Sequence, residues 1–267
     1  MRYAIFSDVH GNIEAFSAAL AVSASEGAEK YVCLGDIVGY NASPRECLHR
    51  LWELDLVAMV RGNHDDYVAL NDDAMPGVNP NARAAVLWTR KQLTEEERNW
   101  LGQLPMRSVI PGTPITIVHA TLDSPDSWGY VFDDHHAADN FSYQFSQICF
   151  CGHSHVPVAF RKKPMSFGDD RTIERLREWE VASREKGDYT IQDALPVEVE
   201  AGYKYLFNIG SVGQPRNHDP RASFCIYDDI DRVVTRYRVP YDIAGAQARI
   251  REAGLPERLA SRLSTGS

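Results

Sequence analysis

The stretch RYAIFSDVHGN, residues 2–12, joins an apolar run to a polar motif that contains Asp8 and His10. The apolar run is typical of a buried strand, and the residues after it place apolar side chains at helical spacing. The same pattern recurs at KYVCLGD, residues 30–36, and at LVAMVRGNHD, residues 56–65, with a second helical stretch between them. This strand–helix–strand–helix–strand order predicts parallel strands with right-handed crossovers, and therefore an α/β fold.

The second half of the chain differs, because strand-like runs follow one another with few helices between them. The runs are RSVIP, ITIVHA, QICFCGHSH, PVAF, YKYLFNIGS, ASFCIYD and RVVTRYRV, between residues 107 and 239. They predict a second sheet that is richer in antiparallel pairs. We expect one domain over residues 1–267, with a charged, partly helical surface excursion at about 162–200 and short C-terminal helices at about 241–263.

Length, charge and cysteine content exclude several classes of protein. The chain has 267 residues, 44% of them hydrophobic, and a net charge of −9, which argues against binding nucleic acid through a broad basic surface. No apolar run approaches the roughly 18 residues of a membrane span, and the N-terminus lacks the pattern of a signal peptide. Five cysteines without a CxxC motif indicate a reducing compartment. We therefore expect a cytoplasmic protein with neither a membrane nor a nucleic-acid partner, and the sequence leaves its oligomeric state open.

Each strong polar motif of the chain follows a predicted strand. In open α/β sheets, ligand sites lie beyond the carboxyl ends of the strands, so these motifs are expected to meet at one edge. His153 and His155 alternate along an extended segment, which directs both rings to the same side. The donors gathered in this way are Asp8, His10, Asp36, Asn63, His119, His153 and His155. Seven oxygen and nitrogen donors exceed the four of a tetrahedral zinc site and fit two metal ions that share one carboxylate.

Five motifs resemble those of the calcineurin-like metallophosphoesterase superfamily: Asp8-x-His10, Gly35-Asp36, Gly62-Asn63-His64-Asp65, His119 and Gly152-His153-x-His155. The resemblance is to its small single-domain phosphoesterases of bacterial and archaeal type. It implies a four-layer αββα sandwich of two mixed sheets flanked by helices, with a two-metal site at one sheet edge. By matched position, Asp8, His10 and His155 would hold the first metal, Asn63, His119 and His153 the second, and Asp36 would bridge them. His64 would face the substrate, and Asp65 would orient His64.

The resemblance implies a metal-dependent phosphoric ester hydrolase. Coordination to a divalent metal lowers the pKa of water from 15.7 towards about 7, so a hydroxide that bridges the metals would attack phosphorus in line. His64 would act as general acid on the leaving oxygen. Four imidazoles in the ligand set favour transition metals over magnesium or calcium. We expect two divalent ions per chain, with manganese or iron favoured and zinc, cobalt or nickel as alternatives.

Four further residues are candidates for binding the substrate. Arg216 and His218 lie in the glycine-rich loop NIGSVGQPRNHDPRAS, residues 208–223, where an arginine suits a second phosphate; an ordinary hairpin connection explains this loop equally well. Trp128 follows the His119 motif, and Tyr40 follows the Asp36 motif. The Trp128 ring could stack on a base or cover its own core, and Tyr40 could line the same pocket or pack in the interior.

These residues indicate the class of substrate less directly than the motifs indicate hydrolysis of a phosphoric ester. A small phosphodiester or nucleotide, such as a dinucleoside polyphosphate, fits metals at one end of a pocket and an arginine with aromatic rings at the other. A phosphoprotein phosphatase is an alternative, although such members of the superfamily are usually longer around the third motif. A catalytically idle scaffold that binds other proteins is a second alternative, and the full set of seven donors argues against it.

Overall fold

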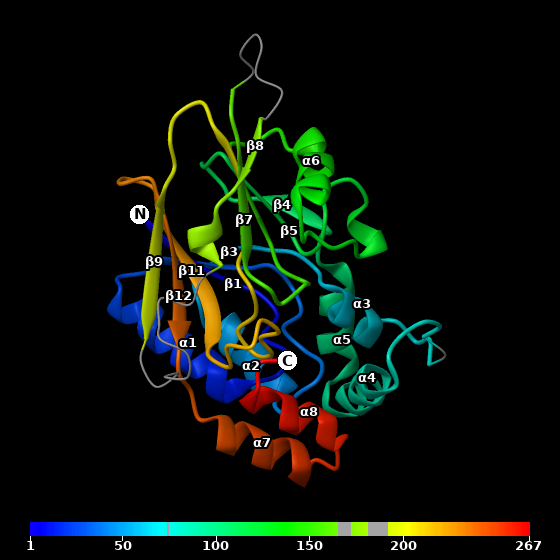
Figure 1. Cartoon of the computed structure of the whole chain (residues 1–267). Helices are drawn as coiled ribbons and strands as arrows, with labels where there is room; N and C mark the ends of the chain where they lie inside the picture. Colours follow the sequence, from blue (N-terminus) through cyan, green and yellow to red (C-terminus); the bar gives the residue numbers. More distant parts are fainter. Residues whose placement is uncertain (74, 165–171, 181–191) are drawn as a thin grey trace.

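The structure, a computed structural model, describes residues 1–73, 75–164, 172–180 and 192–267. Its described residues form two six-stranded sheets (Figure 1). The first has the order β3-β2-β1-β11-β12-β9, from β1 (Arg2–Phe6), β2 (Lys30–Cys33), β3 (Leu56–Met59), β9 (Asp193–Glu198), β11 (Ala222–Asp228) and β12 (Val233–Val239). The second has the order β4-β5-β6-β10-β7-β8, from β4 (Arg107–Val109), β5 (Ile115–Val118), β6 (Ile148–Cys151), β7 (Val158–Lys162), β8 (Ile173–Arg175) and β10 (Lys204–Asn208).

Helices cover the outer faces of both sheets. They are α1 (Ile13–Ser25), α2 (Pro44–Trp52), α3 (Asn63–Ala69), α4 (Pro80–Gln92), α5 (Glu95–Gln103), α6 (Asp134–Tyr143), α7 (Ile243–Glu252) and α8 (Glu257–Ser261), with short 3-10 turns η1 (Pro125–Ser127), η2 (Arg177–Trp179) and η3 (Arg262–Ser264). None of the helices in the described part of the chain has the length and apolar character needed to span a membrane.

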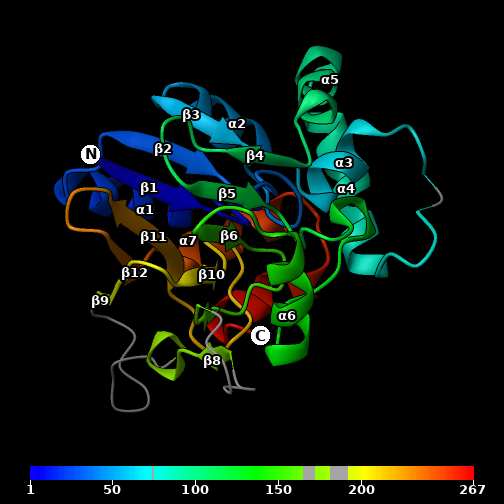
Figure 2. The ribbon, with the colours of Figure 1, turned by 90° about the horizontal axis from the view of Figure 1, so that it is seen from above.

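The pleat of the strands explains the layers. Side chains alternate along β1, so Ala4 and Phe6 join the cluster under α1, whereas Tyr3 and Ile5 join the cluster between the two sheets. On the far side, Phe141 of α6 packs on the outer face of the second sheet. Figure 2 shows the two sheets facing one another, with α1 and α6 on opposite outer sides. The predicted αββα sandwich of two mixed sheets is therefore confirmed.

The pairing of the late strands differs from the simplest reading of the sequence. Strands β1, β2 and β3 are parallel, as expected. However, β11 and β12 extend the first sheet, because β11 pairs antiparallel with β1. Strand β11 is buried on both faces, since Phe224 belongs to the helix-side cluster and Cys225 to the inter-sheet cluster. A strand that is apolar on both sides suits the middle of a sheet.

The described parts of the 162–200 segment correct the expectation of a surface excursion. Strand β8 pairs with β7 at the edge of the second sheet, and β9 pairs with β12 at the edge of the first. Trp179, between them, is fully buried and donates its ring N–H to the carbonyl of Asn208 at 3.0 Å. Residues 165–171 and 181–191 of this segment lie outside the described residues.

Candidate metal centre

The predicted site residues converge on the edge where the strands of both sheets end. Asp8 and His10 follow β1, Asp36 follows β2, and Asn63 begins α3 after β3. The second sheet contributes His119 after β5, and His153 and His155 after β6. Backbone hydrogen bonds hold these loops together, among them the His10 N–H donated to Asp36 O at 2.9 Å and the Gly152 N–H donated to His119 O at 2.9 Å. All seven side chains are at most 8% exposed.

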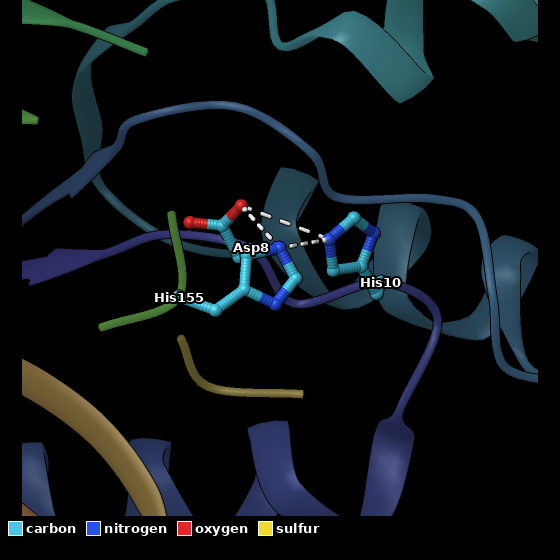
Figure 3. A group of neighbouring side chains, drawn as sticks. All are labelled: Asp8, His10 and His155. Carbon is cyan, nitrogen blue, oxygen red and sulfur yellow. Dashed lines mark hydrogen bonds and ion pairs between the residues drawn. The ribbon is translucent and has the colours of Figure 1, made fainter. Parts of the chain in front are cut away.

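Asp8, His10 and His155 form a tight group (Figure 3). His155 Nε2 lies 3.2 Å from Asp8 Oδ1 and 3.1 Å from His10 Nε2. His10 Nδ1 lies 3.0 Å from the carbonyl of Val38, and His155 Nδ1 lies 2.6 Å from that of Gln214. Because a carbonyl only accepts, both Nδ1 atoms carry a proton, and Nε2 of each ring is the nitrogen directed towards the other. Two ring nitrogens at this distance, beside a carboxylate oxygen, are suitable ligands for one cation.

A second group adjoins the first. His119 Nε2 lies 3.4 Å from Asp36 Oδ2 and 3.3 Å from Asn63 Oδ1. The Nδ1 atom of His119 donates to the carbonyl of Leu34 at 2.8 Å, so Nε2 is again the nitrogen left for a ligand. Asp8 Oδ1 is 4.0 Å from His119 Nε2 and links the two groups. Donors that share one ion at about 2.0–2.2 Å stand about 3–3.5 Å apart, as most of these do.

His153 is oriented differently from the other three imidazoles. Its Nε2 lies 2.9 Å from the carbonyl of Trp128, so Nε2 carries the proton and Nδ1 is the nitrogen with a free lone pair. Its ring centroid is 5.1 Å from that of His119. Burial and the neighbouring His119 lower the pKa of His153 to about 4, so the ring is neutral at pH 7. Among the described residues, His153 belongs to none of the groups whose donor atoms all lie within 4.8 Å of one another, and Nδ1 is the nitrogen that it could offer to a ligand.

The two carboxylates each keep one oxygen for this cluster. Asp8 Oδ2 accepts from Ser7 Oγ at 2.6 Å and from the His153 N–H at 3.0 Å, and Asp36 Oδ1 accepts from the His64 N–H at 2.8 Å. Within the described residues, Asp8 Oδ1 and Asp36 Oδ2 are buried without a hydrogen bond. Burying such oxygens is costly unless a cation or donor compensates them. The donor set and these two oxygens, which accept no hydrogen bond and face imidazole nitrogens, therefore fit divalent metal ions.

The charges of the cluster are strongly coupled. Burial alone would raise the pKa of Asp8 and of Asp36, but the surrounding imidazoles hold both below the ordinary value, His155 acting most on Asp8 and His119 most on Asp36. Burial would lower the pKa of His119, yet Asp36 raises it to about 9. Burial and Arg216 lower the pKa of His155 to about 3. Both carboxylates are thus ionised at neutral pH, as metal ligands must be.

Backbone strain marks the same region. Ten described residues other than glycine have positive φ. Eight of them are site residues predicted from the sequence: Asp8, His10, Asp36, Tyr40, Trp128, His153, His155 and His218. A left-handed conformation costs a residue other than glycine about 1–2 kcal/mol, and such strain persists where the surrounding structure imposes it, commonly at functional sites.

The position of Asp65 corrects its predicted role. Its carboxylate accepts hydrogen bonds from the backbone N–H groups of Asp36 (2.7 Å), Ile37 (3.1 Å) and Gly62 (3.1 Å). Burial, followed by the charge of Asp36, raises the pKa of Asp65 to about 7. Among the described residues, His64 Nδ1 has no hydrogen-bond partner. Asp65 therefore positions the loop that carries Asp36, and it does not orient the His64 ring.

His64 is held by packing. Its ring centroid lies 4.2 Å from that of Tyr40 and 4.9 Å from that of His10. Gly39, with φ of +95°, leaves room for this ring, because a Cβ at Gly39 would meet His64 Nδ1. Burial keeps the pKa of His64 well below its ordinary value. The ring is therefore a neutral imidazole in the metal-free protein.

A cavity of about 420 Å³ opens beside the cluster. Its lining includes Asn63, His64 and His153 of the cluster and Tyr40, Tyr67, Trp128, Tyr130 and Arg216 around it. Three of the four predicted substrate residues thus lie at this cavity. His218 does not line it: the loop turns at this exposed residue, whose N–H donates to Gly266 O at 2.7 Å. The sequence reasoning missed Tyr67, which follows His64 by three residues and so shares one face of α3 with it.

The fold and the cluster define a phosphoric ester hydrolase of a metal-dependent family. The family model of the calcineurin-like phosphoesterase superfamily domain matches residues 1–231, and the chain belongs to this superfamily.

Individual relatives agree with this assignment. An uncharacterized protein of Methanocaldococcus jannaschii is 35% identical over 98% of this chain and 97% of its own. A crystal structure of a metallophosphoesterase from Sphaerobacter thermophilus is 38% identical, with a TM-score of 0.79 and coverage of 100% of this chain and 99% of that one. A hypothetical protein from Pyrococcus horikoshii, 21% identical with a TM-score of 0.73, covers 100% of this chain and 98% of its own and shares the fold.

Gly152 provides a test of the geometry around Asp8. A Cβ at Gly152 would overlap Ser7 Oγ and Asp8 Oδ2. We expect Gly152→Ala to displace the Asp8 carboxylate and to weaken metal binding by about 10–100-fold, as changes beside a ligand do. Calorimetric titration with manganese measures this effect. Gly112→Ala is the control for backbone strain away from the site: Gly112 has a φ of +74°, and no atom lies within 4 Å of the added Cβ. Equal losses of metal binding in both variants would contradict the prediction.

Proposed function

We propose that the chain is a di-metal phosphoesterase that hydrolyses a small phosphodiester or nucleotide. The observation that carries this proposal is the pair of buried carboxylate oxygens without a hydrogen bond, Asp8 Oδ1 and Asp36 Oδ2, surrounded by imidazole nitrogens. The aromatic cavity of about 420 Å³ beside them is large enough for a small organic phosphate. The five cysteines, all buried free thiols, suit the cytoplasm, where we place the protein.

We propose the same division of ligands that the motifs imply. Asp8, His10 and His155 would hold one ion, and Asn63, His119 and His153 the other, with Asp36 between them. Imidazole-rich shells favour manganese, iron, zinc, cobalt or nickel, of which manganese and iron are our preference. When bound, two such ions supply water that ionises near neutral pH and positive charge against the phosphoryl oxygens.

The chain itself would position the substrate and move one proton. His64 lines the cavity, and burial holds its pKa well below the ordinary value in the metal-free protein, so the ring must take up a proton before it can act as an acid. A phosphate anion bound beside the ring favours the protonated form. We propose that the resulting imidazolium passes its proton to the leaving oxygen as general acid and returns to the neutral imidazole, a contribution of typically 10²–10⁴-fold. Asp65 would act on the reaction only through the Asp36 loop that it positions.

The cavity walls suit a substrate with an aromatic group and a second negative charge. The Tyr130 ring stacks on that of His153 at 4.5 Å between centroids and on Phe132 at 5.2 Å, and Tyr130 is 44% exposed. A flat, exposed aromatic surface of this kind can stack on a base. Arg216 lies over the Tyr40 ring at 5.5 Å, at the same cavity. A nucleotide, of which a dinucleoside polyphosphate is one form, meets both features.

Metal titration combined with hydrolysis tests this function. Chelated protein would be titrated with manganese, iron, cobalt, nickel, zinc and magnesium, with bis-p-nitrophenyl phosphate and p-nitrophenyl phosphate as substrates. We expect activity to return at about two ions per chain, with the diester hydrolysed faster than the monoester. A preference for the monoester would favour a phosphatase, the phosphoprotein phosphatase included. Two bound ions without turnover of either compound would favour an idle scaffold, and failure to bind any metal would overturn the proposal.

A further inference from the structure

A second cavity, of about 270 Å³, adjoins the aromatic one. Tyr40, Asn79 and Arg216 line both cavities. The rest of the second lining is Asn81, Arg258, Leu259 and Arg262. Three arginines from two distant parts of the chain therefore surround a space that opens next to the proposed metal centre. We call this space the arginine cavity.

The C-terminal segment presents two of these arginines. Arg258 lies in α8 and Arg262 begins η3, four residues later, so both side chains leave the same face. Leu259 and Leu263 anchor this segment in an apolar cluster that includes Ala85 of α4. In Figure 1, α8 lies beside α4 at the base of the molecule. The segment is thus a fixed wall of the arginine cavity.

Side-chain carboxylates do not account for the three positive charges. In the part of the chain that the structure describes, Arg216, Arg258 and Arg262 form no ion pair with an aspartate or glutamate. Arg216 donates to the neutral Gln214 Oε1 at 3.0 Å. The Arg262 Nε donates to Ser267 O at 2.5 Å, an oxygen of the terminal carboxylate, which offsets one of the three charges.

Such an arrangement is costly for the fold alone. Burial, followed by the charges of Arg216 and Arg258, lowers the pKa of Arg262 to about 10. Like charges at i and i+4 also destabilise a helix. Elsewhere the chain pairs a buried arginine with acid: Arg221 lies 2.7 Å from Asp193 and 2.6 Å from Asp219. The positive charges that remain at this cavity beyond the Ser267 carboxylate therefore match an anion that is not part of the chain.

We propose that the arginine cavity binds a second phosphate group of the substrate while the scissile phosphate lies at the metal centre. This inference rests on the proposed function. Planar guanidinium groups bind phosphate oxygens in pairs of parallel hydrogen bonds. Helix α4, thirteen residues long, begins at the cavity with Asn79 as its N-cap, and the positive end of its dipole favours the same charge. Arg258 and Arg262 follow residue 231, where the family match ends, so two of the three arginines of the subsite lie beyond that match.

Two measurements test the subsite, one of them without metal or turnover. Calorimetry would measure inorganic tripolyphosphate binding to the chelated, metal-free protein, in wild type, Arg258→Gln and Arg262→Gln. Hydrolysis would compare p-nitrophenyl thymidine 5′-phosphate with and without a 3′-phosphate, as the ratio of the two kcat/KM values. Arg251→Gln is the matched control, because Arg251 is not among the residues that line the cavity and pairs with Glu257 at 2.8 Å. Circular dichroism and thermal unfolding check that each variant is folded. Arg258 is exposed, so Arg258→Gln should fold normally and still tests the subsite if Arg262→Gln is unstable.

We expect each cavity variant to weaken tripolyphosphate binding at least tenfold and to reduce the preference for the substrate with the second phosphate by a similar factor. Arg251→Gln should change neither value. Hydrolysis of both substrates with an unchanged preference ratio in the variants would overturn the subsite and leave the proposed function standing. Arginine-dependent tripolyphosphate binding without hydrolysis of either substrate would overturn the proposed function, and with it the role of this anion site as a substrate subsite.

Discussion

The Asp36→Asn variant is expected to bind at least one metal ion fewer than the wild type and to hydrolyse bis-p-nitrophenyl phosphate about 10³-fold more slowly. A loss of this size corresponds to about 4 kcal/mol of transition-state stabilisation. This value agrees with the several kcal/mol that a bound metal ion contributes to stabilising charge in the transition state. The reason lies in Asp36 Oδ2, which is buried, lies 3.4 Å from His119 Nε2 and 3.6 Å from His10 Nε2, and has no hydrogen bond among the described residues. An amide at this position removes the negative charge between the two ligand groups.

This prediction is tested by measuring the metal content of Asp36→Asn and wild type by mass spectrometry, and their kcat/KM in saturating manganese. Asp55→Asn is the control for the same chemical change, because Asp55 pairs with Lys30 at the surface. The asparagine variant should keep its fold, since Asp36 Oδ1 accepts only the His64 N–H and an amide oxygen can do the same. Two tightly bound ions and near-normal turnover in Asp36→Asn would show that Asp36 does not bridge the metals.

The His64→Asn variant is expected to retain both metal ions and to lose about 10²–10⁴-fold in kcat, the range of a general acid. The contact of His64 with the ligand Asp36 is made by its backbone N–H, which the substitution preserves. The loss should depend on the leaving group. The p-nitrophenolate leaving group departs with little protonation. In His64→Asn, hydrolysis of the p-nitrophenyl diester should therefore fall less than hydrolysis of a diester with an alkyl leaving group.

The structure also contains the competing explanation for His64. Ring and carboxylate donors of His10, Asp36 and His64 all lie within 4.8 Å of one another, which would permit His64 to be a metal ligand. In that case His64→Asn would lose an ion, and turnover of the two diesters would fall equally. Metal content and the leaving-group dependence, measured on the same samples, separate the two roles. The general-acid role is wrong if the ion is lost.

The amino-acid sequence was sufficient to predict the fold and the residues that gather at the cluster. Apolar runs of strand length identify β1, β2 and β3, and the helices between them require parallel strands. Parallel strands end at a common edge, so residues such as Asp8, Asp36 and His153, which follow different strands, must come close together. This inference uses only local pattern and chain direction, which is why it needs no knowledge of long-range pairing.

Contacts between distant segments required the tertiary structure. The pairing of β11 with β1 joins residues more than 200 positions apart. No local pattern in the sequence of β11 tells which of the two sheets this strand joins. The carbonyl of Gln214 decides which nitrogen of His155 is free for a metal. Backbone N–H groups decide that Asp65 supports the Asp36 loop and not His64.

The same reason explains why the sequence reasoning overlooked the arginine cavity. Arg258 and Arg262 stand in a polar C-terminal helix and are typical of a solvated surface when considered locally. Only the packing of Leu259 and Leu263 against α4 brings them to Arg216, more than 40 residues away in the chain. Local sequence thus determined the chemistry of the proposed metal centre, whereas tertiary packing determined the arginine cavity beside it. The physical reason is that like charges repel, so they are brought together only where the burial of apolar surface elsewhere in the chain outweighs their repulsion.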